Sequence, residues 1–173
     1  MKTKKFLTLV LAALMAVTAV FTLASCDEAS DKAEKTEKKE RKPVTIEVFK
    51  ENVENEGFEV TLREKEMDGV NMQVAFAYKK GFEIEFAVID QENEKCGDLL
   101  DSIDGWIKEQ SEGSDVDVIS KTTDENYNCL EMTDDYLNHY YFEARIENTA
   151  IIAECKDDDM GYVQGIMDKL GYR

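Results

Sequence analysis

The stretch NMQVAFAYKKGFEIEFAVI, residues 71–89, decides the fold because it reads as two β-strands joined by a tight turn. Large apolar side chains occupy alternate positions on both sides of the turn: Met72, Val74, Phe76, Tyr78, Phe82, Ile84, Phe86 and Val88. Successive side chains of a strand point to opposite faces, so this alternation predicts an antiparallel hairpin with one apolar face. The turn is expected at Lys79-Lys80-Gly81, where glycine allows the chain to reverse sharply.

A third strand and a helix are expected upstream of this hairpin. Phe58, Val60 and Leu62 alternate with polar residues, and Asp68-Gly69 is typical of a two-residue hairpin turn. Further upstream, three apolar residues lie at helical spacing and a glycine follows them: Ile46, Phe49, Val53 and Gly57. This pattern predicts a helix over residues 45–56 that packs on the three strands.

The downstream half repeats the same order of elements. A helix is expected from about residue 93 to 112, with its acidic residues, Asp104 among them, on the solvent side. Four strands are expected near 116–121, 127–133, 136–146 and 149–155, and a last helix from about residue 158 to Gly171. The sequence therefore predicts an α+β fold of order αβββ-αββββ-α. We expect a single antiparallel sheet of about six to seven strands, with three helices packed on one face.

The charge of the folded part limits its partners. Residues 44–173 hold 32 of the 38 acidic residues but only 12 of the 21 basic ones, a net charge of −20. Binding to nucleic acid is excluded because neutralising phosphates needs clustered bases, and anionic lipid headgroups are disfavoured for the same reason. A basic protein or a basic component of the cell envelope would be complementary in charge.

The first 26 residues have the pattern of an export signal. Lys2, Lys4 and Lys5 precede an uncharged apolar run that ends in Leu23-Ala24-Ser25-Cys26. This ending resembles the lipobox of bacterial lipoproteins. The resemblance implies that a diacylglyceryl group joins the sulfur of Cys26 and that signal peptidase II cuts before it. The lipid bilayer would then be a partner, through Cys26, of a protein held at the cell membrane and facing the exterior or the periplasm.

A charged segment follows the lipobox. Residues 27–42 hold six acidic and six basic residues, and their only apolar residues are two alanines. Such a segment buries too little surface to offset its ordering entropy, so we expect a disordered tether. The expected organisation is a signal peptide over 1–25, the lipidated cysteine and tether over 26–43, and an acidic α+β domain over 44–173.

Three cysteines remain after Cys26, and one histidine. Cys96 falls on the apolar side of the long helix, and export allows a disulfide between Cys129 and Cys155 on the later strands. His139 could act as the base that activates one of these thiols as a nucleophile, but only if the fold brings the two together. No sequence signature of a known cysteine-enzyme family surrounds the cysteines. The strand over 136–146 has aromatic residues on both faces, so Leu137, His139 and Tyr141 form a candidate binding patch.

The sequence contains no phosphate-binding glycine loop, no nucleophile elbow, and no spacing of ligands typical of zinc or calcium sites. We therefore expect no cofactor, no resident metal and no catalytic residues, and interpret the chain as a non-enzymatic binding or interaction module of unknown ligand. Two alternatives remain open at this point: a small cell-envelope enzyme using Asp/Glu chemistry, and a weak calcium-dependent adhesion module.

Overall fold

The structure of the protein is a computed structural model that describes residues 41–112 and 116–173. The elements in chain order are helix α2 (Ile46–Asn55), strands β1 (Glu59–Met67), β2 (Val70–Lys79) and β3 (Phe82–Ile89), helix α3 (Cys96–Gln110), strands β4 (Val116–Asp124), β5 (Tyr127–Asp134), β6 (His139–Ile146) and β7 (Thr149–Lys156), the short 3₁₀ helix η2 (Asp157–Asp159), and helix α4 (Met160–Leu170). The signal peptide and most of the tether expected from the sequence lie outside these residues. None of the described helices is long and apolar enough to cross a membrane.

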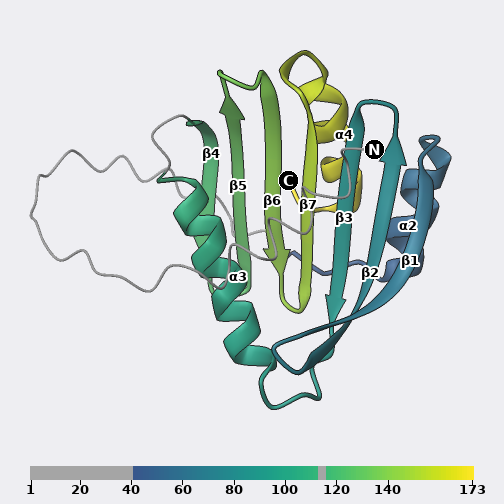
Figure 1. Cartoon of the computed structure of the whole chain (residues 1–173), viewed down its shortest axis with the longest axis vertical. Helices are drawn as coiled ribbons and strands as arrows, with labels where there is room; N and C mark the ends of the chain where they lie inside the picture. Colours follow the sequence, from purple (N-terminus) through teal and green to yellow (C-terminus); the bar gives the residue numbers. More distant parts are fainter. Residues whose placement is uncertain (1–40, 113–115) are drawn as a thin grey trace, which may run out of the picture. The chain divides into compact units, whose positions relative to one another are not determined.

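The seven strands form one open antiparallel sheet in the order β1-β2-β3-β7-β6-β5-β4 (Figure 1). Pairing of β3 with β7 joins the first meander to the second, with Phe86 opposite Ile151. The α+β class, the single antiparallel sheet and the order of elements predicted from the sequence are confirmed.

Local sequence signals account for the ends of the first elements. The hydroxyl of Thr45 accepts a hydrogen bond from the Val48 amide at 3.4 Å and caps the start of α2. The turn between β1 and β2 has positive φ at both central residues, Asp68 (55°) and Gly69 (84°), which is the geometry of a two-residue hairpin. Gly81, at φ 88°, closes the next hairpin as the sequence predicts.

Helices α2 and α4 cover one face of the sheet, which we call the helix-pair face. Phe49 of α2 stacks on Phe86 of β3, with ring centroids 4.7 Å apart. Val163, Ile166, Met167 and Leu170 of α4 are buried in the same cluster as the apolar side chains of β6 and β7. This face therefore carries the main core of the domain.

Helix α3 packs on the opposite face, where it contacts β5 and β6 (Figure 1). Its residues Leu99 and Ile107 are buried against Val74 of β2 and Leu130 of β5, respectively. The expectation that all three helices share one face was wrong. The reason lies in β2, where Ala75 and Ala77 face α2 while Met72 and Val74 face α3, so that the strand is buried on both sides.

The two edge strands, β1 and β4, are mostly exposed. Charged residues run along β1, where Arg63, Glu64 and Lys65 are consecutive. The pairing of β4 with β5 shifts between Val118 and Ser120, which marks a β-bulge. Charges and bulges are features that hinder the addition of a further strand at an edge.

Candidate functional site

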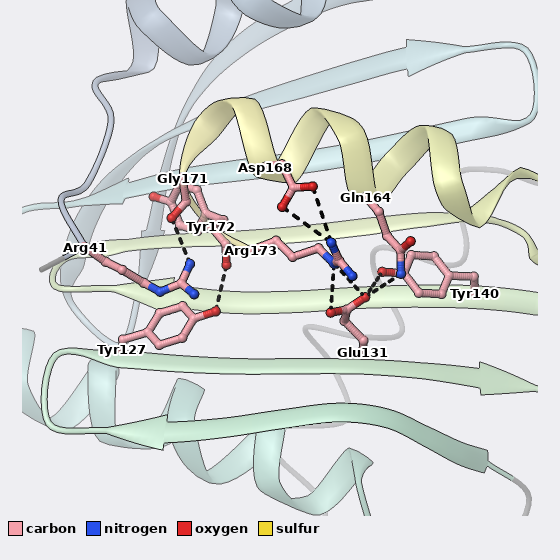
Figure 2. Close-up of polar contacts among 9 residues, drawn as sticks. All are labelled: Arg41, Tyr127, Glu131, Tyr140, Gln164, Asp168, Gly171, Tyr172 and Arg173. Atoms are coloured by element: carbon pink, nitrogen blue, oxygen red, sulfur yellow. Dashed lines mark hydrogen bonds and ion pairs between the residues drawn. The ribbon is translucent and has the colours of Figure 1, made fainter. Parts of the chain in front are cut away.

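The first polar cluster that stands out surrounds Glu131 of β5, on the helix-pair face (Figure 2). Its carboxylate accepts hydrogen bonds from the Tyr140 hydroxyl and the Gln164 amide, both at 2.8 Å. The guanidinium of Arg173 donates to the same carboxylate at 3.1 Å and also lies 3.3 Å from Asp168. Although Glu131 is only 2% exposed, both of its oxygens have partners, so the cluster is suited to holding α4 and the last residues against the sheet.

A second set of contacts beside this cluster fixes both ends of the described chain. Arg41 donates to the Gly171 carbonyl at 3.1 Å, and its guanidinium lies 4.1 Å from the centre of the Tyr127 ring. The Tyr127 hydroxyl in turn donates to the Tyr172 carbonyl at 2.8 Å (Figure 2). Arg41, which the sequence places in the tether, is thus in contact with the domain.

The opposite face of the sheet offers a different environment because α3 covers only part of it. Along β7, Ile151, Ala153 and Cys155 are buried beneath α2 and α4, whereas Ile152 and Glu154, which point the other way, remain half-buried. In β3, Glu85 is likewise half-buried on the α3 side. The central strands therefore present an accessible surface beside α3.

This surface is acidic. We call it the acidic face and define it by three glutamates, Glu85, Glu143 and Glu154, together with His139 and Tyr141. Strand pairing places Glu143 opposite Ile152, and Ile152 opposite Glu85, which puts β7 between these two glutamates. Glu154 lies opposite Tyr141, two residues along the strands from the pair of Ile152 and Glu143. Three half-buried or buried carboxylates thus lie on adjacent strands of one face, and the exposed Glu83 of β3 lies opposite Glu154.

Two of the three carboxylates have a basic side chain beside them. Lys65 donates to Glu85 at 3.3 Å. The Nδ1 atom of His139 lies 2.8 Å from Glu154, at ion-pair distance but without the geometry of a hydrogen bond, so the attraction requires a protonated histidine. Glu143 differs: within the described residues its Oε2 atom is buried and has no hydrogen-bond partner.

Burial raises the pKa of each of the three glutamates that define the acidic face, and of Tyr141. Removal from water raises the pKa of Glu143 to about 8. Burial also raises the pKa of Glu85 and of Glu154, against the opposing effects of Lys65 and His139. The pKa of the Tyr141 hydroxyl rises to about 12, first through burial and then through the nearby Glu154. Perturbed acids gathered on one accessible surface are typical of functional sites.

The shifted pKa of Glu143 predicts how stability depends on pH. Between about pH 4.5, the ordinary value for glutamate, and about pH 8, the folded state holds a proton that the unfolded state has lost. Stability must therefore fall as pH rises through this window, by up to about 1.4 kcal/mol for each pH unit. In Glu143→Gln this contribution disappears, and we expect a flatter curve of unfolding free energy against pH in urea titrations. Parallel curves for the two proteins would contradict the shift.

The candidate patch Leu137, His139 and Tyr141 is only partly assembled. His139 and Tyr141 share one face of β6 with ring centroids 6.1 Å apart, and both are half-buried. Leu137 lies in the turn before the strand, because β6 begins at His139 rather than near Tyr136. The expected row of three residues on one strand is therefore not formed.

The proposed disulfide between Cys129 and Cys155 was wrong, because β6 lies between their strands. Two strand spacings amount to about 9.6 Å, whereas a disulfide requires Cα atoms within about 7 Å. Cys96, Cys129 and Cys155 are free thiols, and Cys96 is buried against β2 as expected. Burial raises the pKa of Cys129 to about 11 and that of Cys155 to about 12, which disfavours the reactive thiolate.

His139 does not form a nucleophilic pair with either of these thiols. Its side chain lies on the acidic face with Tyr141, whereas Cys129 and Cys155 belong to the core under α2 and α4. Nor are any three His, Cys, Asp or Glu side chains among residues 41–112 and 116–173 placed to hold a metal ion. The described part of the chain therefore gives no support to the alternative of calcium-dependent adhesion.

The sequence did not identify the three glutamates of the acidic face. Acidic residues are spread along the whole domain, so their number singles out none of them. One usable signal was the position of Glu143 between Phe142 and Ala144 in the middle of an apolar strand, since an acid there must be buried or face a partner.

No family model matches the chain, and no curated protein matches it. Among solved structures, the chain is similar to a GTP binding regulator from Thermotoga maritima, with 15% identity over 71% of this chain and 84% of that one. The TM-score is 0.42. A likeness at this level carries no argument about function, so the function is argued from the residues of the acidic face.

Proposed function

We propose that this chain is a membrane-anchored, extracytoplasmic binding module, without enzymatic activity of its own, that holds a basic partner on the acidic face. The observation that carries the proposal is the set of half-buried to buried carboxylates on sheet strands that no helix covers fully. The anchoring rests on the lipobox ending at Cys26. Two acyl chains on this residue would give stable attachment, whereas one chain binds only marginally.

A basic partner suits this surface for two reasons. The described domain has a large excess of acidic over basic residues, which attracts cations over distances of several ångströms. On the acidic face, half-buried apolar groups such as Ile152 and Tyr141 lie beside the carboxylates. A long basic side chain can contact both, because its methylene stem is apolar and its end is charged.

An enzyme using Asp/Glu chemistry is the second candidate, since a carboxyl with a pKa near neutrality can serve as a general acid. In glycoside hydrolysis, which uses such an acid, a second free carboxylate must face the first. The two nearest candidates, Glu85 and Glu154, are already engaged, Glu85 by Lys65 at 3.3 Å and Glu154 by the His139 ring at 2.8 Å. We therefore favour binding over catalysis.

A comparison of two doubly neutralised variants tests the role of the acidic face. Glu85→Gln/Glu154→Gln removes two charges from this face, and the matched control, Glu64→Gln/Glu66→Gln, removes two from the exposed edge strand β1. Using N-acetyl-pentalysine amide as the probe and the full-length chain in non-ionic detergent, we expect calorimetry to show at least about fivefold weaker binding for the first variant. Equal loss in both variants would mean that net charge alone attracts the probe, and would refute the proposal.

A further inference from the structure

Glu143, in the middle of the sheet, is an acidic group for which the described residues supply no counter-charge. Its residue is 3% exposed, and strand pairing sets it between Leu130 and Ile152. The Oε2 atom is buried and, within the described residues, has no hydrogen-bond partner. A buried polar atom left unpaired costs free energy. Such a position is maintained at a cost to stability, which points to a partner that the isolated domain does not supply.

The cations nearest to Glu143 are engaged elsewhere. Arg145, two residues along the same strand, donates through Nε and Nη2 to both oxygens of Asp104 on α3, at 2.6 and 2.8 Å. Among the described residues, the other basic groups on the strands of this side also have partners: Lys65 pairs with Glu85, His139 with Glu154 and Lys121 with Ser111, and the Arg63 guanidinium lies over the Phe76 ring. Other titratable groups on this side are the Tyr141 hydroxyl, which is neutral at physiological pH, and two acids, Glu83 and Asp134, which offer no positive charge.

Resting on the proposed function, we infer that Glu143 is the residue that pairs with the ammonium group of a lysine side chain from the basic partner. The immediate surroundings of Glu143 are apolar, with Leu130 and Ile152 on the neighbouring strands. A lysine offers a flexible methylene stem for these contacts and a compact charge for a single carboxylate oxygen. An arginine is best matched by two free oxygens in a fork, as Asp104 already provides for Arg145.

Proton release accompanies this pairing. Near pH 7 the buried carboxyl of Glu143 carries a proton, because its pKa is raised to about 8. A bound ammonium group favours the ionised carboxylate, so the proton leaves Glu143 for solvent while the lysine keeps its own. Binding should therefore release close to one proton at pH 7. Affinity should rise about tenfold between pH 7 and pH 9, as the cost of removing that proton disappears.

Calorimetry with the full-length chain and N-acetyl-pentalysine amide tests this inference. Titrations at pH 7 in two buffers with different ionisation enthalpies give the number of protons released, and a series from pH 7 to 9 gives the change in affinity. We expect Glu143→Gln to release no proton, to bind at least about tenfold more weakly at pH 9, and to lose the pH dependence. The control Glu66→Gln, which removes an exposed charge from the edge strand β1, should retain proton release and pH dependence.

The outcomes separate this inference from the proposed function. Wild-type protein that binds the probe without releasing a proton would overturn the role of Glu143, even if Glu143→Gln were poorly folded. If affinity then still fell in Glu85→Gln/Glu154→Gln but not in its control, the acidic face would stand as the binding surface. Equal proton release with N-acetyl-pentaarginine amide, or with CaCl₂ in place of the peptide, would overturn the assignment to lysine.

Discussion

Replacing Glu131 by alanine is expected to lower the free energy of unfolding by about 3 kcal/mol. The substitution removes the acceptor shared by Tyr140, Gln164 and Arg173. The Tyr140 hydroxyl would then be left in a fully buried position with no carboxylate to accept its hydrogen bond. Equilibrium unfolding in urea, followed by far-ultraviolet circular dichroism, measures the change.

Two further variants make this prediction specific. Glu66→Ala removes the same side chain from an exposed position of β1 and should change stability by less than about 0.5 kcal/mol. Glu131→Gln keeps an acceptor for Tyr140 but loses the ion pair with the partly exposed Arg173. Its loss of unfolding free energy should therefore lie between those of Glu66→Ala and Glu131→Ala. If Glu131→Ala were as stable as Glu66→Ala, the cluster would not hold α4 in place.

Replacing Cys26 by alanine is expected to abolish membrane attachment altogether. The lipobox reading makes the Cys26 sulfur the only acceptor of the diacylglyceryl group, and processing by signal peptidase II depends on that modification. In bacteria fed labelled palmitate, the variant should incorporate no label and should accumulate as the unprocessed precursor.

Cys96→Ala is the matched control, since Cys96 is a buried thiol within the folded domain. It should be labelled, processed and recovered with membranes as the wild type is. Labelling and maturation that persist in Cys26→Ala would show that the apolar N-terminal run serves another purpose, such as an uncleaved anchor, and would remove the lipid from the proposed function.

The elements that the sequence predicted best are those set by local patterns. The alternation over residues 71–89 and the glycine at 81 specify the hairpin without reference to the rest of the chain, and the structure confirms the hairpin and its turn. The single apolar face expected for it was wrong, because Val74 of β2 faces α3 whereas Phe86 of β3 lies opposite Ala75 and faces α2. The side on which each helix packs is not local. Ala75 and Ala77 are too small to stand out among the large apolar residues of the strand, yet they are buried under α2. Val74, on the other side of the strand, packs against α3.

Asp104 illustrates the same limit. Helical periodicity placed it on the solvent side of its helix, but in the structure it binds Arg145 of β6 and the Asn128 amide of β5. An acid can face a sheet if the sheet supplies a buried cation, and that cation is distant in the sequence. Glu143 was missed because acidic residues are spread along the whole domain, and only its apolar neighbours Phe142 and Ala144 set it apart.

The charges and the bulge of the two edge strands would matter most if the chain is anchored to a membrane. Lipid anchoring would confine many copies to two dimensions, where they meet far more often than free molecules in solution. An open sheet is then at risk of growing from one copy into the next through its unpaired backbone. The consecutive charges of β1 and the bulge of β4 oppose that growth at the two margins. The same protein can therefore be crowded on a surface while each copy remains a separate unit.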